Sequence, residues 1–450
     1  MGVICLGALG LLIVAAIWRQ THILLLAIAM LLAVTLFEIV EKDYTVVRDT
    51  DGQITTVTGT IMRREMPTEA KQRLYVRLHE SMSGIRLVTV DLARFPEYGE
   101  RQVIRFECEQ QPPTSREETS ALRNRYAKGI GASCVASNLM VIDDRASCLR
   151  YPLLCGRFYI VKQIETLWPR PIRSLVLGLL LGDKADFPKQ VLDQFSAAGI
   201  SHIIALSGFN ITVIIVCLEA LALRLMISKR WRPYAIIAMI ALFTVFVGSA
   251  ASIVRAACMG SLALWGKSLG RRPSATRLLL ISAAAMTLAN PYTLLYDVGF
   301  QLSCCATFGL LAFSEWFEAR LWFIPARAGL RGSLSTTLAA SLPTIPLLLY
   351  TFGTLSIISP LTNMLVLPLI PHIMWTGALA VLVSVVSPSL AALIANGVSR
   401  ACQYILDISA WAASVSWAAV PMQITLSTSL VLSLAILLFS RYVQKTMERA

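Results

Sequence analysis

The sequence is poor in charged residues and in histidine. Only 15% of its 450 residues are Asp, Glu, Lys or Arg, against about 25% in soluble proteins. It contains neither an HxHxDH cluster nor a CxxC pair, the groupings from which many zinc sites are built. We therefore expect no metal site and no other cofactor. The four histidines are His22, His79, His202 and His372.

Two further patterns are absent. There is no Walker A loop of the GxxxxGK[ST] type, the phosphate-binding loop of many ATPases. There is no basic segment ahead of the first apolar run, Val3–Trp18, and a second apolar run follows almost at once. A cleavable signal peptide needs such a basic segment, so we expect the first run to remain in the membrane. If the protein needs an energy source, a separate protein or the proton gradient would have to supply it.

Hydrophobic residues are abundant. They make up 56% of the chain, and the mean hydropathy is +0.65. A helix that crosses a bilayer needs about 20 apolar residues. The sequence therefore predicts a polytopic α-helical membrane protein with about eleven spans. They are 3–18, 21–40, 203–226, 234–250, 252–268, 277–290, 298–314, 334–351, 358–385, 390–414 and 424–441.

The last part of this series is the least regular. Pro368 and Pro371 must break or kink the span 358–385, because proline cannot continue the hydrogen bonding of a helix. The span 390–414 contains several polar residues, so it also fits a helix that lies partly along the membrane surface. The orientation of 358–414 therefore stays open.

Most of the positive charge lies beside the predicted spans. The net charge is +13, yet residues 43–150 contain 16 Lys and Arg against 15 Asp and Glu. Short basic loops are typically cytoplasmic. Eleven spans with the N-terminus outside place the loops 19–22, 228–233, 266–277 and 318–333 and the C-terminal tail in the cytoplasm. The sequence thus predicts a multi-pass protein of the cytoplasmic (inner) membrane, with the N-terminus and residues 43–150 outside.

Residues 43–150 contain five short runs rich in β-branched residues, which predicts a small all-β domain inserted between the spans. Five strands in about 100 residues fit an OB-like barrel. Cys108 and Cys134 fall in the fourth and fifth runs, so a disulfide between these strands is a candidate. Cys148 and Cys155 are also near, and four cysteines allow three connectivities. OB-folds often bind single-stranded nucleic acid, but this domain is near neutral, so a scaffolding role is the alternative.

The remaining chain divides into three parts: 1–42 with two spans, 151–200, and the membrane core 201–450. Residues 151–200 mix apolar and charged residues at helical spacing, which predicts interfacial or re-entrant helices. Gly199 fits the left-handed cap that ends such a helix.

Polar residues interrupt the predicted spans at a similar depth. In HIIALSGFNITVI, at about 100° per residue, His202, Asn210 and Ser207 fall on one flank of a continuous helix, and Gly208 allows close approach of another backbone. Polar groups at this depth normally face protein or water. The pattern predicts a hydrophilic vestibule. Other spans add Arg255, Asp297, Gln301 and Asn363.

Each of these residues also has a structural interpretation. Arg255 and Asp297 could form an ion pair, and Asn363 could satisfy backbone groups freed by its flanking prolines. His202 could anchor a helix end, and Ser207 could bond its own helix.

Several stretches together resemble the ComEC family of competence proteins. They are GLLLGDKADFP, FSAAGISHIIALSGFNITVI, SIVRAACMGSLALWGKSLGRRPSATRLL, NPYTLLYDVGFQLSCCATFGLL and LAASLPTIPLLLYTFGTLSIISPLTNMLVLPL. They occur in the family's order and cover about 160–370. The two N-terminal spans followed by an OB-like domain are also similar to the family. Together the motifs are fairly specific, whereas each alone is weak.

The resemblance implies a channel that passes single-stranded DNA inward across the cytoplasmic membrane during natural transformation. It implies the lipid bilayer as surroundings and a separate DNA receptor, nuclease and cytoplasmic helicase or ATPase as partners; the oligomeric state stays open. The matched stretches contain the candidates for lining the channel or contacting DNA: Asp183, His202, Ser207, Gly208, Asn210, Arg255, Asp297, Gln301 and Asn363.

The chain departs from the family at two points. Many members have histidine where this chain has Asn210. Many also carry a C-terminal metallo-β-lactamase-like domain, whereas this sequence ends at Ala450 with no such metal motif. We therefore expect a short form without nuclease activity, a channel rather than an enzyme.

Two other functions fit less well. A small-solute or lipid transporter would also use broken helices with polar groups at mid-membrane, but no internal repeat is visible in the sequence. An intramembrane hydrolase would use His202 and Ser207, which point about 140° apart on a continuous helix, too far for a direct hydrogen bond.

Overall fold

A computed structural model describes most of the chain beyond residue 54. The described ranges are 55–68, 71–82, 85–93, 95–96, 98–99, 101–110, 132–143, 152–183, 187–204, 208–248, 251–271, 274–325 and 329–447. The predicted spans 3–18 and 21–40 and the candidate residue Ser207 lie outside them. The chain forms two compact units: residues 1–159 with 280–300, and residues 160–279 with 301–450.

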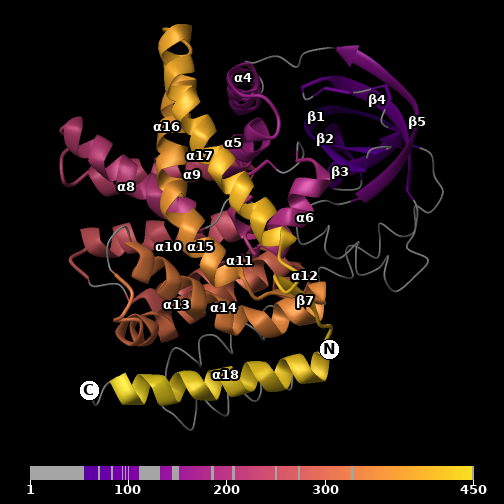
Figure 1. Cartoon of the computed structure of the whole chain (residues 1–450). Helices are drawn as coiled ribbons and strands as arrows, with labels where there is room; N and C mark the ends of the chain where they lie inside the picture. Colours follow the sequence, from indigo (N-terminus) through magenta and orange to yellow (C-terminus); the bar gives the residue numbers. More distant parts are fainter. Residues whose placement is uncertain are drawn as a thin grey trace. The chain divides into compact units, whose positions relative to one another are not determined.

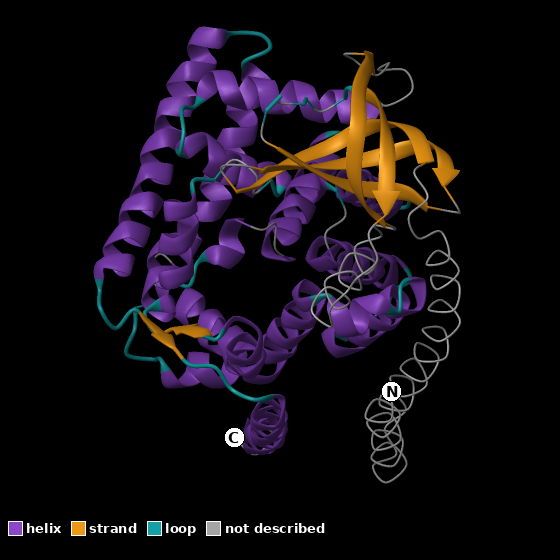
Figure 2. Cartoon of the chain, turned by 90° about the vertical axis from the view of Figure 1, so that its right-hand side faces the viewer, coloured by secondary structure: helices purple, strands orange, loops and turns teal. Residues whose placement is uncertain are grey.

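The first unit contains a closed barrel of five strands (Figures 1 and 2). The order around the barrel is β1-β2-β3-β5-β4, with β1 paired to β4. The pairing is antiparallel except between β3 and β5, which run parallel. The prediction of a small five-stranded β domain is confirmed. The strands are β1 (Thr55–Thr68), β2 (Lys71–Met82), β3 (Ile85–Ala93), β4 (Val103–Gln110) and β5 (Ala132–Asp143).

The alternation of side chains in the strands produces the barrel core. In β2, Leu74, Val76 and Leu78 are buried, whereas Arg77 and His79 between and beyond them are exposed. Successive side chains of a strand point to opposite faces, so one face fills the barrel and the other meets solvent. The core is therefore mainly apolar, although Gln72 is also buried on this face of β2.

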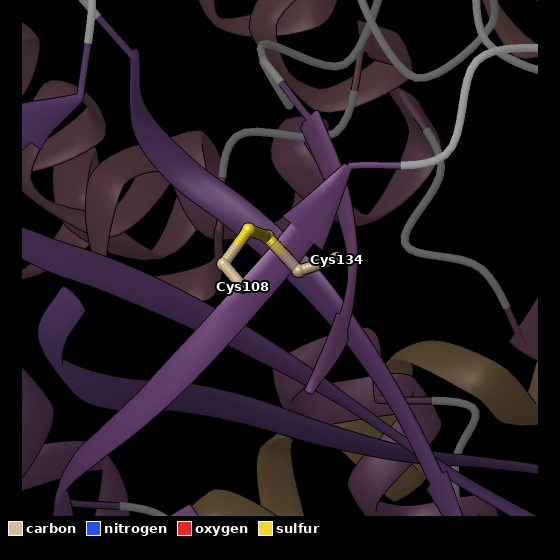
Figure 3. The surroundings of a disulfide bond; sticks show 2 residues. All are labelled: Cys108 and Cys134. Carbon is tan, nitrogen blue, oxygen red and sulfur yellow. A yellow bond between two sulfur atoms is a disulfide. The ribbon is translucent and has the colours of Figure 1, made fainter. Parts of the chain in front are cut away.

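A disulfide joins two strands of this barrel (Figure 3). The sulfurs of Cys108 in β4 and Cys134 in β5 are 2.00 Å apart, and their Cα atoms are 5.1 Å apart. Cys155 is also disulfide-bonded. Among the described residues, the free cysteines all belong to the helical unit: Cys217, Cys258, Cys304, Cys305 and Cys402. Oxidised and reduced cysteines are thus separated between the two units.

The rest of the described chain is almost entirely helical (Figure 2). The helices are α4 (Pro152–Leu167), α5 (Ile172–Leu181), α6 (Lys189–Ala197), α7 (Ser201–Ile204), α8 (Gly208–Arg224), α9 (Arg232–Val247), α10 (Ala251–Ser268), α11 (Ala275–Ala289), α12 (Tyr292–Tyr296), α13 (Val298–Arg320), α14 (Leu330–Phe352), α15 (Ser359–Val366), η3 (Leu367–Leu369), α16 (Ile370–Val383), α17 (Pro388–Ser414) and α18 (Leu426–Met447). Two short strands, β6 (Thr354–Ser356) and β7 (Ala419–Pro421), pair antiparallel.

Four described segments are long and apolar enough to cross a membrane. They are α13, α14, α18 and the run Ser359–Val383 that joins α15 to α16. The sequence predicts about eleven spans, of which 3–18 and 21–40 lie outside the described residues. Several other apolar helices in the described part of the chain are shorter than these four segments. For example, α8 has 17 residues, α9 has 16 and α11 has 15.

Three predictions about helix ends and breaks have different outcomes. The break at Pro368 is confirmed, since η3 separates α15 from α16, and Gly199 has the expected positive φ of 72° after α6. The single helix 203–226 is wrong. The structure has two helices there, α7 ending at Ile204 and α8 beginning at Gly208, so side-chain angles counted along one continuous helix do not apply.

The helical unit has its largest core where α5, α6 and α7 meet α15, α16 and α17. The buried stripe of α17 recurs at Ala391, Ala395, Val398 and Cys402, which keeps one face of this long helix against its neighbours. Trp168, fully buried after α4, donates its indole N–H to the carbonyl of Ala395 at 3.1 Å. Smaller cores join α8, α9 and α10, and α13, α14 and α18.

Candidate functional site

The polar residues of the HIIALSGFNITVI stretch separate between two helices. His202 lies in α7 with its side chain exposed, whereas Asn210 lies in the first turn of α8 and is buried. Gly208 begins α8. The structure adds nothing on the hydrolase alternative, since Ser207 lies outside the described residues.

Arg255 lies close to this stretch, beside Gly208. It lies in α10 and is only 5% exposed. Its Nη1 donates to Oγ1 of Thr307 in α13 and lies 3.8 Å from the sulfur of Met259. The Thr307 hydroxyl donates in turn to the carbonyl of Ser303 at 2.9 Å, so its lone pairs are free to accept from Arg255.

The other side of the guanidinium faces α8. A Cβ added at Gly208 would lie 3.5 Å from Nη2 of Arg255 and 3.5 Å from Cβ of Ala256. The Nε atom is buried and has no hydrogen-bond partner among the described residues. Three helices, α8, α10 and α13, thus converge on one guanidinium.

In the described structure, Arg255 and Asp297 each bind groups other than the suggested ion-pair partner. Arg255 is bound by uncharged groups. Asp297 precedes α13, and its Oδ1 accepts from the backbone N–H of Phe300 at 3.1 Å. This is an N-cap contact, in which a carboxylate binds a backbone N–H that has no acceptor within the helix. Gln301 is half-buried one turn further along α13.

Asn363 belongs to a different cluster. Its Nδ2 donates to Oγ of Ser359 at 3.1 Å, and Ser359 donates to the carbonyl of Gly199 at 3.3 Å. Thr362 donates to the carbonyl of Ala198 at 2.7 Å. Ser356 binds the carbonyl of Ala197 at 2.7 Å. We call Ser356, Ser359, Thr362 and Asn363 the hydroxyl clamp.

The hydroxyl clamp binds the carbonyl groups at the C-terminal end of helix α6. The last carbonyls of a helix have no partner within it, and here three side-chain hydroxyls supply the missing donors. Gly199 makes the close approach possible: a Cβ there would lie 2.4 Å from Cβ of Ser359, far inside contact distance. Asn363 therefore acts on the end of α6 through Ser359. This differs from the suggested contact with backbone groups freed by its flanking prolines.

Sequence reasoning missed the hydroxyls of the hydroxyl clamp and Thr307. Positions 359, 362 and 363 share a helix face, which was the only local signal. Their acceptors lie about 160 residues away in the chain. Asp183 is half-buried just after α5, where its backbone N–H bonds the carbonyl of Leu177 at 3.4 Å. Within the described residues, no group of His, Cys, Asp and Glu could hold a metal ion.

Comparisons with known proteins cover this helical region. Residues 179–446 match the model of the family described as "Competence protein". "ComE operon protein 3" of Bacillus subtilis (strain 168) is 29% identical over 51% of this chain and 29% of its own length. "Competence protein ComA" of Neisseria gonorrhoeae is 29% identical over 54% of this chain and 34% of its own. "Uncharacterized protein YcaI" of Escherichia coli (strain K12) is 26% identical over 48% and 29%.

These matches span only about a third of the curated relatives' length. No solved structure matches the chain. The family match, from the end of α5 into α18, contains both the Arg255 environment and the hydroxyl clamp. Since it extends over more than half of the sequence, this chain belongs to the competence protein family.

Proposed function

We propose that the chain forms a passage for single-stranded DNA across the cytoplasmic membrane during natural transformation. The family and one of the matched relatives, Competence protein ComA, carry the word competence in their names. DNA carries about one negative charge per nucleotide, so its path through a membrane protein needs positive or hydrogen-bonding groups. The channel candidates in the matched region include both kinds.

Arg255 is the observation that carries the proposal. A charged residue inside a membrane segment is costly, about 2.5–3.5 kcal/mol at a helix centre, and it normally pairs with an opposite charge. Arg255 binds a hydroxyl and a thioether instead. A cation kept inside without a bound carboxylate suits the passage of a polyanion. Asn210 is buried on the helix beside it.

The barrel supports an extracytoplasmic OB-like domain. Its five strands, their closure and the parallel β3–β5 pairing agree with that class of Greek-key barrel. The disulfide supports the outer side, since disulfides persist in oxidising compartments. With the basic loops inside, this gives the N-terminus outside and the C-terminus in the cytoplasm. A separate DNA receptor, nuclease and helicase or ATPase would deliver, process and pull the strand.

A small-solute or lipid transporter is the second candidate. It is favoured by the broken run α15–η3–α16, since transporters build binding sites at interrupted helices. Solute flux into liposomes that contain the purified protein, without any DNA flux, would favour it.

The test is gene deletion in a transformable host, with labelled DNA as cargo. We expect label to stay outside the cytoplasm and transformants to fall to background, because no path remains. The wild-type gene should restore both entry of label and transformation. A gene with Arg224→Gln, which removes an arginine at the exposed end of α8, should restore them as well. Normal entry of label into the cytoplasm of the deletion strain would contradict the proposal.

A further inference from the structure

Two positive groups meet between α8 and α10. One is the guanidinium of Arg255, whose Nη2 lies beside Gly208. The other is the N-terminus of α8, which begins at Gly208. The first N–H groups of a helix lack acceptors within it, and the helix dipole places about half a positive charge at that end. Like charges this close to each other repel, and a negative charge bound near both would relieve the repulsion.

The described residues supply no such negative charge. Arg255 uses Nη1 for Thr307 and Met259, both uncharged. Its Nε is buried and without a hydrogen-bond partner. Cys304 of α13 also lies near the guanidinium, and as a thiol it is uncharged. Only uncharged groups bind this buried cation. A buried charge without a counter-charge costs several kcal/mol in general, so this arrangement favours a ligand that brings the missing charge.

We propose that Arg255 and the first turn of α8 together form a binding site for one phosphate group, the phosphodiester of a DNA backbone. This rests on the proposed function. Arginine binds phosphate oxygens through two parallel N–H donors, and helix N-termini bind phosphate through backbone N–H groups. Gly208 has no side chain, so the ligand can approach the backbone closely.

Thr307 acts as a positioning residue for this site. A carboxylate in its place would hold Arg255 equally well, but it would also neutralise the guanidinium. A hydroxyl fixes the side chain and leaves its charge available to the ligand. The contacts proposed for DNA go to phosphate, so the site reads no base sequence. It must also release each phosphate, which requires moderate affinity.

The experiment measures thermal unfolding of the full chain in nanodiscs of zwitterionic lipid. The probes are short oligothymidylate, the same oligomer with uncharged methylphosphonate linkages, and inorganic phosphate. We expect oligothymidylate and phosphate to raise the unfolding midpoint of the wild type, and the uncharged oligomer to leave it unchanged. The dissociation constant for oligothymidylate should rise about ten- to a hundredfold in Arg255→Gln, the loss expected for charged hydrogen bonds. Arg224→Gln should bind like the wild type.

Two further measurements distinguish a loss of binding from misfolding of the variants. Without ligand, Arg255→Gln should unfold at the same temperature as the wild type or higher, because the substitution removes an uncompensated buried charge. A purely structural arginine would give a lower midpoint. Gly208→Ala should fold normally, since its nearest contacts would be 3.5 Å, and should weaken oligothymidylate binding by placing a methyl group at the site.

The proposal is overturned if oligothymidylate raises the unfolding midpoint of the wild type and of Arg255→Gln equally, or if it raises neither. Stabilisation by anionic phosphatidylglycerol nanodiscs alone, without a response to oligothymidylate, would identify a lipid phosphate and overturn the DNA assignment. Failure of the proposed function is distinguishable from these outcomes: labelled DNA would enter the deletion strain although the purified protein binds phosphate at Arg255.

Discussion

In the barrel, Leu74 and Val76 point inward while Arg77 and His79 point outward. In the helical unit, apolar side chains fill the cores but also lie on the surface, and some polar residues are buried. Val216 of α8 is 59% exposed, whereas Arg255 is buried. The surfaces differ because the surroundings differ: water favours charge on the outside, whereas lipid leaves polar groups to pair inside the protein. The comparison predicts that like substitutions will have unlike effects in the two units.

The largest difference concerns cysteine. Removing the disulfide in a Cys108→Ala, Cys134→Ala variant should lower barrel stability by about 3–4 kcal/mol, because the bond closes a long loop and restricts the unfolded chain; the two residues are 26 apart. Cys402→Ala, at a buried free thiol of α17, should cost only about 1 kcal/mol. Limited proteolysis of the full chain against temperature measures both. Equal protection of the barrel with and without its cysteines would contradict the expectation.

The second difference concerns exposed valines. Val216→Asp in the middle of α8 should lower membrane insertion, at a cost of about 3 kcal/mol, if lipid covers this face. Val141→Asp in β5, where the valine is 40% exposed, should be nearly neutral, about 0.5 kcal/mol or less, because water meets an exposed strand. Two measurements compare the variants: the fraction of the protein that inserts into the membrane, and the unfolding midpoint of the inserted protein. A well-inserted Val216→Asp would mean that water, and not lipid, contacts this part of α8.

The smallest difference lies within the helical unit. Thr362→Val keeps the shape of the side chain but leaves the carbonyl of Ala198 without its donor, which should cost about 1–3 kcal/mol. Thr376→Val is the control, because the hydroxyl of Thr376 is exposed and bonds only the carbonyl of His372 in its own helix. The unfolding midpoint of Thr362→Val should therefore be lower than that of Thr376→Val. The same midpoint for both would show that the hydroxyl clamp adds nothing to stability.

The barrel was easier to predict than the helical unit for a physical reason. Its strands alternate between core and water, so β-branched and polar residues alternate in the sequence, and all five strands were located. In the helical unit, apolar residues contact both lipid and protein. Hydropathy does not separate these surroundings, so it does not fix where helices such as α8 and α9 begin and end.

The site was predictable only as a set of residues. Polar side chains in apolar runs identified Arg255, Asn210 and Asn363, and all three are buried. Their partners were not visible: Thr307 lies 52 residues from Arg255, and no local pattern reports a contact at that separation. The flank shared by His202 and Asn210 was an artefact of assuming one continuous helix where the chain forms α7 and α8.

The bond from Thr362 to Ala198 also sets an order of assembly. Its two residues are 164 apart, and a ribosome adds roughly 5–20 residues per second, so the carbonyl is made roughly 8–33 s before its donor. During that interval the carbonyl of Ala198 lacks this donor. The end of α6 is therefore completed only after α15 has been synthesised.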